Sequence, residues 1–335
     1  METPAVTKSQ ESETDLEILI QSLPKEKYWL RHGLDLHQIQ GFWIPSFAIR
    51  GIIKFRNQFL ARDTDVILAS FPKSGTTWLK ALTYSIVNRS YDSSDNPLTR
   101  FSPHDLVHNF ENFIFKSENY PDLESLPNPR IFATHSPYQL LPESIKNSKC
   151  KVVYVCRNLL DQFVSRWHFK DSVKSETPQF PISEAFEMFY QGIDGYGPSW
   201  AHLLGYWNAG MENPQKVLFL KYEDLKENPN FYVKKLAEFV GFPFSEEEER
   251  EGVVERIVKF CSFENLKNLE VNKNGKRQIG PLKNSAYFRK GKVGDWANCL
   301  TPSMVERGMK LMEDKFSGSG LSFKLSLPEA EESVM

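Results

Sequence analysis

The chain has no uninterrupted apolar run of about 18 residues, the length that a membrane-spanning helix needs, so we expect no transmembrane segment. Its first residues, METPAVTKSQESETD, lack the basic start and apolar centre of a secretory signal, and they are too acidic for a transit peptide. The four cysteines form no CxxC pair. We therefore expect a cytoplasmic protein with reduced thiols at Cys150, Cys156, Cys261 and Cys299.

An excess of charge of one sign is also lacking, because the formal net charge is only −2. This balance gives no reason to expect nucleic acid or a membrane as a partner, although a local basic cluster can still bind an anion. We find no internal repeat and no clear linker in the 335 residues. The sequence therefore predicts one domain over residues 16–324, between a disordered tail at 1–15 and a loose tail at 325–335.

The stretch from residue 66 to residue 78, VILASFPKSGTTW, predicts a buried strand, a tight loop and the start of a helix. This layout directs backbone N–H groups and the positive end of the helix dipole at an anion. The lysine of the loop adds charge, and its glycine allows a close approach of the backbone. The stretch fails the GxxxxGK[ST] pattern because its lysine precedes its glycine. The alternative interpretation is an ordinary turn rich in small residues.

Further short apolar runs predict strands at 130–134, 151–156 and 217–222. Helical patterns alternate with them at 46–61, 76–89, 158–170, 182–191, 199–210, 229–240, 246–260 and 304–316. Such alternation is typical of an α/β fold with a mainly parallel central sheet, in which ligands bind beyond the carboxyl ends of the strands. The residues at those predicted ends are Lys73, His135, Arg157 and Tyr222. Residues 90–129 are expected to be irregular, and residues 264–295 to be mobile.

One histidine pair is close to a metalloprotease pattern. His104 and His108 enclose Asp105 in HDLVH, which differs from HExxH by its aspartate. We see no nearby third ligand and expect no metal, although both histidines could line a pocket.

PKSGTTW resembles the 5′-phosphosulfate loop of the cytosolic sulfotransferases, and FRKGKVGDW near the C-terminus resembles their 3′-phosphate segment. The resemblance spans roughly residues 20–324, and SLPKEKYW and SFENLKNLEVNK are most similar to the plant branch. It implies transfer of a sulfuryl group from 3′-phosphoadenosine 5′-phosphosulfate (PAPS) to a hydroxyl of a small plant metabolite or hormone. Flavonoid, brassinosteroid and hydroxyjasmonate acceptors all remain open.

The resemblance also implies a role for each matching residue. The 5′-phosphosulfate and the adenine edge would be held by Lys73, Ser74, Gly75, Thr76, Thr77 and Trp78. The 3′-phosphate would be held by Arg157, Ser165, Arg289, Lys290 and Gly291, and the adenosine lined by Tyr222, Cys261 and Phe263. His135 in ATHSP would be the general base, with a pKa suited to neutral pH, while Lys73 stabilises the leaving phosphate.

Simpler interpretations and two departures from the family accompany these assignments. A lone histidine is often structural, Arg157 could pair with Asp161 one turn on, and Tyr222 could merely end a strand. Ala133 stands where animal members have a lysine, whose help would be absent or supplied elsewhere. The animal dimer motif KxxxTVxxxE is only half preserved at Ala297, Thr301, Pro302 and Glu306, so we expect a monomer.

Two rival functions remain. A P-loop nucleotide kinase-like phosphotransferase would need Mg²⁺ and usually an acidic residue at a strand end, where this chain has Arg157. A non-catalytic nucleotide-binding or interaction protein would have no need of both Lys73 and His135.

Overall fold

The computed structural model describes residues 13–31, 33–89, 96–115, 122–172, 180–277 and 282–325. In this part of the chain a central sheet of four parallel strands has the order β5-β4-β6-β7. These strands are β4 (Val66–Ser70), β5 (Ile131–Thr134), β6 (Lys151–Cys156) and β7 (Val217–Lys221). The expected α/β class, the four strands and their parallel pairing are therefore confirmed. All five residues of β4 are buried, as a parallel strand covered on both faces requires.

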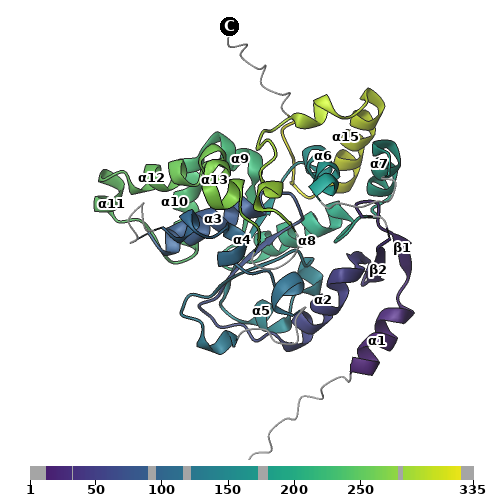
Figure 1. The fold of residues 1–335 in the computed structure, drawn as a ribbon, viewed down its shortest axis with the longest axis horizontal. Coiled ribbons are helices and arrows are strands. Elements are labelled where there is room, and N and C mark those ends of the chain that lie inside the picture. The colour runs from purple at the N-terminus through teal and green to yellow at the C-terminus, as the bar shows by residue number, and fades with distance from the viewer. Residues whose placement is uncertain are drawn as a thin grey trace, which may run out of the picture.

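Helices cover both faces of the sheet. Alternate residues of β4 join two different hydrophobic clusters, Ile67 and Ala69 on one face and Val66 and Leu68 on the other. The first cluster continues into α2 (Ser46–Gln58), α6 (Leu159–Phe169) and α8 (Ser199–Glu212). The second continues into α3 (Thr76–Val87), α10 (Pro229–Phe239) and α12 (Val253–Phe260), which lie together in Figure 1.

The remaining helices are mostly short. The α-helices among them are α1 (Glu13–Ser22), α4 (Pro103–Leu106), α5 (Glu143–Asn147), α7 (Ile182–Tyr190), α9 (Tyr222–Glu227), α11 (Glu246–Arg250), α13 (Phe263–Asn268), α14 (Glu270–Lys273) and α15 (Pro302–Phe316). A π-helix, η2, spans Phe110–Ile114. The 3₁₀ turns are η1 (Pro97–Thr99), η3 (Leu123–Ser125), η4 (Tyr138–Leu140), η5 (Lys170–Ser172), η6 (Asn284–Tyr287) and η7 (Asp295–Asn298).

A small antiparallel sheet at the N-terminus was not expected. It consists of β1 (Lys25–Lys27), β2 (Asp35–Ile39) and β3 (Phe42–Pro45). Gln40 and Gly41 join β2 to β3 with φ angles of 49° and 82°, which suits a tight two-residue hairpin turn. The sheet reaches the segment before α8, because the N–H of Trp43 donates to the carbonyl of Gly197 over 2.7 Å.

The structure corrects two other expectations. The helix predicted at 246–260 is broken into α11 and α12 at Gly252, whose φ of 70° is left-handed. The described part of 264–295 is not merely loose, because it contains α13, α14, η6 and η7. Buried amides stabilise this region: Asn272 donates to the carbonyl of Leu266, and Asn284 donates to that of Val271.

The segment expected to be irregular, 90–129, is described at 96–115 and 122–129, where it forms short helices. Phe110 in η2 stacks on Phe55 of α2 with ring centroids 4.1 Å apart, so this segment is part of the core. A Cβ at Gly51 would lie 2.1 Å from the carbonyl oxygen of Glu111, and only glycine allows α2 to approach η2 this closely.

The predicted tails fall largely outside the described residues, which begin at Glu13 with α1 and end at residue 325. Within the described ranges, no helix combines the length and the apolar character needed to span a bilayer.

Candidate active site

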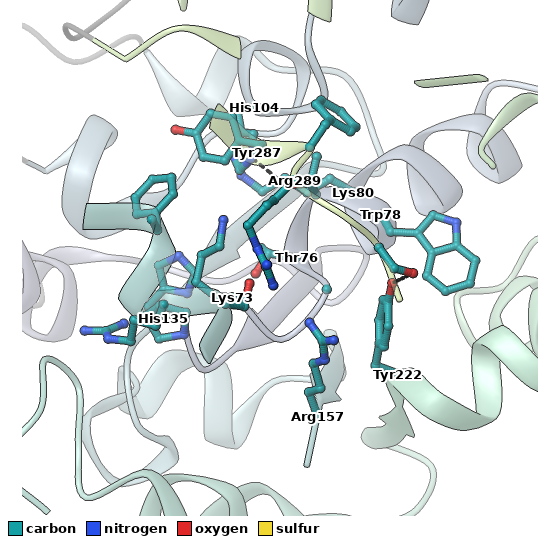
Figure 2. A pocket seen from close by; sticks show the side chains of 18 of the residues that line it. Lys73, Thr76, Trp78, Lys80, His104, His135, Arg157, Tyr222, Tyr287 and Arg289 are labelled. Atoms are coloured by element: carbon teal, nitrogen blue, oxygen red, sulfur yellow. Dashed lines mark hydrogen bonds between the residues drawn. The ribbon is translucent and has the colours of Figure 1, made fainter. Parts of the chain in front are cut away.

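A cavity of about 1180 Å³ opens at the carboxyl edge of the central sheet. Its lining includes the residues that follow the four strands: Lys73 after β4, His135 after β5, Arg157 after β6 and Tyr222 after β7. Figure 2 shows these four side chains around one space. The convergence expected from the strand pattern is therefore present. A single ligand site usually has 300–1,000 Å³, so this cavity has room for two ligands.

The cavity is strongly cationic although the whole chain is slightly acidic. Among the described lining residues there is no aspartate or glutamate, whereas ten are basic: Arg31, Lys73, Lys80, Arg157, Arg166, Lys226, Arg277, Arg289, Lys290 and Lys292. A pocket with this charge attracts anions and repels cations. Within the described ranges, no group of three or more His, Cys, Asp or Glu side chains could hold a metal ion.

The loop between β4 and α3 has the backbone geometry of an anion-binding turn. Lys73 and Gly75 have φ angles of 70° and 110°, and a Cβ at Gly75 would lie 2.9 Å from the Tyr222 ring. The N–H groups of the first turn of α3 have no partner within the helix, so they are available to an anion. Thr76, Thr77 and Trp78 line the cavity together with Lys73 and Gly75.

Ser74 differs from its neighbours in this loop. Its side chain is fully buried and is not among the lining residues, and its Oγ has no hydrogen-bond partner in the described part of the chain. Thr76 and Thr77 do line the cavity, although the Thr76 hydroxyl also lies 2.6 Å from the hydroxyl of Ser70.

The Lys73 ammonium lies 4.1 Å from the centroid of the Phe169 ring, at the end of α6. Burial lowers the pKa of Lys73 to about 7, and the neighbouring Arg289, Arg157 and Arg166 add to this effect. A polyanion bound among these cations would reverse the repulsion and raise the pKa of Lys73.

Arg157 contacts both the protein and the cavity. One of its terminal nitrogens lies 3.5 Å from the carboxylate of Asp161 and donates to the carbonyl of Lys292 over 2.5 Å. The structural ion pair considered above is thus present, and Arg157 lines the cavity as well. Ser165 lines the same cavity from α6.

Residues 289–292 line the cavity, and the segment that follows them is held to α6 through Asp161, whose carboxylate accepts hydrogen bonds from the N–H groups of Gly294 and Trp296. Arg289 and Lys290 both line the cavity and pair with Asp295 at 2.6 and 2.7 Å. These contacts bring the predicted 3′-phosphate segment next to Arg157.

The aromatic residues predicted to line the adenosine surround the same end of the cavity. The Tyr222 hydroxyl donates to the carbonyl of Gly291 over 3.0 Å, and its ring meets Trp78 edge to face at 5.6 Å. A Cβ at Gly291, where φ is 65°, would lie 2.5 Å from the Phe263 ring. Phe263 and Gly291 therefore pack in direct contact in the cavity wall.

Cys261 does not join this group, and the expectation that it lines the adenosine is corrected. Its side chain is fully buried on the far side of the wall, with its sulfur 3.3 Å from the hydroxyl of Ser85. Burial raises the pKa of its thiol to about 12. The next residue, Ser262, lines the cavity instead.

His135 is held by its backbone and by one ring nitrogen. Its Nδ1 donates to the carbonyl of Ser70 over 2.8 Å, and its carbonyl accepts a hydrogen bond from Nε2 of His202. In the neutral ring this leaves Nε2 of His135 unprotonated and able to accept a proton. Burial lowers the pKa of His135 to about 3, so the expected value near neutrality is corrected. At pH 7 the ring is a neutral base.

Several lining residues were missed by the sequence. Arg166 is fully buried, with Nε 2.9 Å from the Asp194 carboxylate and a terminal nitrogen 2.7 Å from the Tyr28 hydroxyl. Lys80 and Tyr287 also line the cavity and were not predicted, whereas His104 and His108 line it as the sequence suggested they could. The partners of the missed residues lie far away along the chain, and no motif marks them.

Comparisons with known proteins agree with this geometry. A family model described as "Sulfotransferase domain" matches residues 63–320. Cytosolic sulfotransferase 15 of Arabidopsis thaliana is 47% identical over 333 residues, which cover 97% of this chain and 92% of that protein. Flavonol 4′-sulfotransferase of Flaveria chlorifolia is 48% identical over 299 residues, which cover 88% of this chain and 92% of that protein.

Solved structures give the same result. The crystal structure of an Arabidopsis thaliana sulphotransferase superposes with a TM-score of 0.75 at 39% identity, covering 96% of this chain and 100% of that one. Mouse sulfotransferase SULT7A1 complexed with PAP superposes with a TM-score of 0.66 at 27% identity, covering 85% and 96% of the two chains. The chain therefore belongs to the sulfotransferase family, in the branch of the plant cytosolic enzymes, and is itself a sulfotransferase.

Proposed function

We propose that this protein transfers the sulfuryl group of PAPS to a hydroxyl of a small metabolite, with planar phenols of the flavonol type as the first acceptors to test. The observation that carries the proposal is the cationic cavity, in which an anion-binding loop and a neutral histidine meet at one sheet edge. The flavonol class is suggested by the names of two relatives. Brassinosteroids and hydroxyjasmonates are the alternative acceptors.

The residues of the cavity fit both ends of PAPS. At the 5′ end, Lys73 supplies charge, and the first turn of α3 supplies N–H and hydroxyl donors. At the 3′ end, Arg157, Ser165 and Arg289 lie together, with Lys290 and the backbone of Gly291 beside them. The Nε atoms of Arg157 and Arg289 have no hydrogen-bond partner among the described residues, and a phosphate would supply acceptors for this group of cations.

The transfer is an in-line displacement in which His135 and Lys73 act at opposite ends. His135 takes the acceptor's proton on Nε2 while the acceptor oxygen forms its bond to sulfur. The bond between sulfur and the bridging oxygen breaks, and its electron pair stays on the leaving phosphate. Lys73 stabilises the negative charge that grows on that oxygen. Adenosine 3′,5′-bisphosphate (PAP) and the sulfated acceptor are the products.

The acceptor end of the cavity lies around His135. The ring of Tyr196 lies 5.5 Å from the His135 ring, and His108 stacks on Phe113 at 4.1 Å with an angle of 5° between the planes. Flat aromatic surfaces of this kind favour a planar ring system over a bulky aliphatic one. The names of the relatives further suggest that the reaction takes place in the cytosol.

Rates with labelled PAPS and a panel containing a flavonol, a steroid alcohol and a hydroxyjasmonate test the proposal. We expect turnover with at least one acceptor and the highest kcat/KM for the flavonol. A higher kcat/KM for an aliphatic alcohol would refute the flavonol assignment, and absence of turnover with all three would refute the acceptor class.

A parallel assay with EDTA distinguishes the kinase-like alternative. The cavity wall has ten cations and, among its described residues, no carboxylate that could hold Mg²⁺, so we expect activity to survive chelation. Loss of activity that Mg²⁺ restores would instead favour phosphoryl transfer.

A further inference from the structure

A buried lysine on α3 contacts a histidine in the cavity wall. Lys80 lies three residues after Thr77, and its side chain is only 2% exposed. Its ammonium donates to the carbonyl of Val107 over 2.8 Å and lies 3.2 Å from Nδ1 of His104. Figure 2 shows Lys80 and His104 side by side at one end of the cavity.

These contacts fix the direction of the hydrogen bonds. Burial, with the charge of Arg277, lowers the pKa of Lys80 to about 7, so Lys80 is mainly an ammonium below this pH. An ammonium group can only donate, so in this form Nδ1 of His104 accepts from Lys80. Burial and the charge of Lys80 hold the pKa of His104 well below its ordinary value, so its ring is neutral. The single ring proton then sits on Nε2, which lies 2.9 Å from the hydroxyl oxygen of Thr77 and donates to it.

The hydroxyl of Thr77 is thereby oriented toward the cavity. Its oxygen accepts from His104, and no other hydrogen-bond partner of this hydroxyl is found among the described residues. The hydroxyl proton is therefore left for a ligand in the cavity, which Thr77 lines. A threonine in this state can donate its hydroxyl proton to an anion.

The orientation of His104 is itself fixed. Its ring lies 4.0 Å from the ring of Tyr287, and the hydroxyl of Tyr287 lies 3.4 Å from a terminal nitrogen of Arg277. The packing against Tyr287 fixes the plane of the imidazole, and the contacts with Lys80 and Thr77 select the orientation of its nitrogens within that plane.

We propose that Lys80 and His104 are positioning residues that hold Thr77 as a hydrogen-bond donor to the 5′-phosphosulfate end of the donor. This inference rests on the proposed function, because it presumes that the anion at the loop is that of PAPS. It also offers a source for the positive charge that Ala133 cannot supply. The charge of Lys80 polarises His104, and His104 in turn polarises the Thr77 hydroxyl.

The test is a double-mutant cycle on the full chain, with affinities measured by titration calorimetry. PAP carries the 5′-phosphate that Thr77 would contact, and adenosine 3′-phosphate lacks it and serves as the control probe. We expect Lys80→Met to weaken PAP binding about fivefold to tenfold, the value of about one hydrogen bond, and to leave adenosine 3′-phosphate binding unchanged.

Coupling to Thr77 separates a positioning role from a merely structural one. In the Thr77→Val background, Lys80→Met should cause no further loss of PAP affinity, whereas in the Thr77→Ser background its full effect should remain. His104→Phe keeps a ring against Tyr287 but removes both nitrogens, and it should reproduce the Lys80→Met result. This second variant also decides the question if thermal unfolding shows that Lys80→Met does not fold.

Two results would overturn the inference. Effects that multiply in the Lys80→Met/Thr77→Val double variant would show that Lys80 does not act through Thr77. An equal loss for both probes would show a general disturbance of the cavity. Failure of the unmodified protein to bind PAP would be a different result, because it would refute the proposed donor as well.

Discussion

The carboxylate of Glu111 accepts a hydrogen bond from the backbone N–H of His135 over 2.6 Å, at a position where Glu111 is 0% exposed. It also accepts from the Thr134 hydroxyl and from the side-chain amide of Asn109. One carboxylate thus joins the π-helix η2 to the end of β5, where His135 begins the loop. Burial raises the pKa of Glu111, although these hydrogen bonds oppose the shift.

The first prediction concerns this carboxylate. Glu111→Ala should lower the free energy of unfolding by about 3 kcal/mol, because it leaves buried donors without a partner at roughly 1–3 kcal/mol each. Glu111→Gln keeps an acceptor oxygen for the His135 N–H and should lose about 1 kcal/mol or less. Urea denaturation measures both values. Equal losses in the two variants would show that the hydrogen bond to His135 contributes little.

The second prediction separates binding from chemistry at His135. His135→Ala should bind PAP almost normally and fold with similar stability, because the ring contacts the acceptor and not the nucleotide. Its turnover should fall by about 10²–10⁴-fold, the usual contribution of a positioned base. Lys73→Ala should weaken donor binding as well as turnover. Full turnover of His135→Ala with an aliphatic alcohol would contradict the assignment of the base.

The third prediction concerns pH and Lys73. Because the pKa of Lys73 is lowered to about 7, its ammonium predominates below pH 7, is half present at pH 7 and is lost as the pH rises further. The affinity for PAP should therefore fall with rising pH above about 7, by up to about tenfold per unit from this one group. Lys73→Arg stays charged, so its affinity should depend less on pH. An unchanged pH profile in that variant would exclude Lys73 as the titrating group.

The fourth prediction concerns the 3′-phosphate. PAP should raise the melting temperature much more than AMP does, because only PAP engages Arg157, Ser165 and Arg289 with its 3′-phosphate. Arg157→Ala should bring the shift for PAP down toward that for AMP and should leave the AMP shift unchanged. Ser165→Ala should also reduce the melting-temperature shift caused by PAP, but by less than Arg157→Ala does. It leaves the ion pair of Arg157 with Asp161 in place. Equal shifts from PAP and AMP in the unmodified protein would contradict this assignment.

The fifth prediction concerns assembly. Thr301 and Pro302 align with the animal dimer motif, and here they begin helix α15. The side chain of Thr301 caps the helix by accepting a hydrogen bond from the N–H of Met304, and Pro302 is the first helical residue. We expect a monomer at micromolar concentration. Static light scattering behind size-exclusion chromatography gives the mass directly, and a mass of twice 38.8 kDa would mean that another surface forms a dimer.

The sequence predicted the central sheet and much of the site because these depend on local patterns. The apolar runs at 66–69, 130–134, 151–156 and 217–222 have the length of buried strands, and each is long enough to be recognised in the sequence. In a parallel sheet their ends must meet at one edge. Lys73, His135, Arg157 and Tyr222 could therefore be brought together without knowledge of any side-chain contact.

The parts of the site and of the fold that were not predicted depend mostly on contacts between residues far apart in the sequence, which no local pattern reveals. Glu111 lies 24 positions from His135, and Arg166 lies 138 positions from Tyr28. The error at Cys261 has a different origin, because a match between sequences does not give side-chain directions: Cys261 follows the last residue of α12 and is buried, whereas Ser262 lines the cavity. The strands β1 to β3 are only three to five residues long, and β1 is wholly exposed whereas β3 is mostly buried, so their apolar pattern is too short to distinguish from a loop.

The hydrogen bond between Trp43 and Gly197 has a consequence for how selectivity can change. Through it, the N-terminal sheet is attached to the segment before α8, and residues that flank the sheet, Tyr28, Arg31 and Phe47, line the cavity. All three precede residue 63, where the match to the family model begins, whereas the anion-binding loop and residues 289–291 lie inside it. We therefore expect substitutions at Arg31 or Phe47 to reshape this part of the cavity wall without replacing any residue of the anion-binding loop.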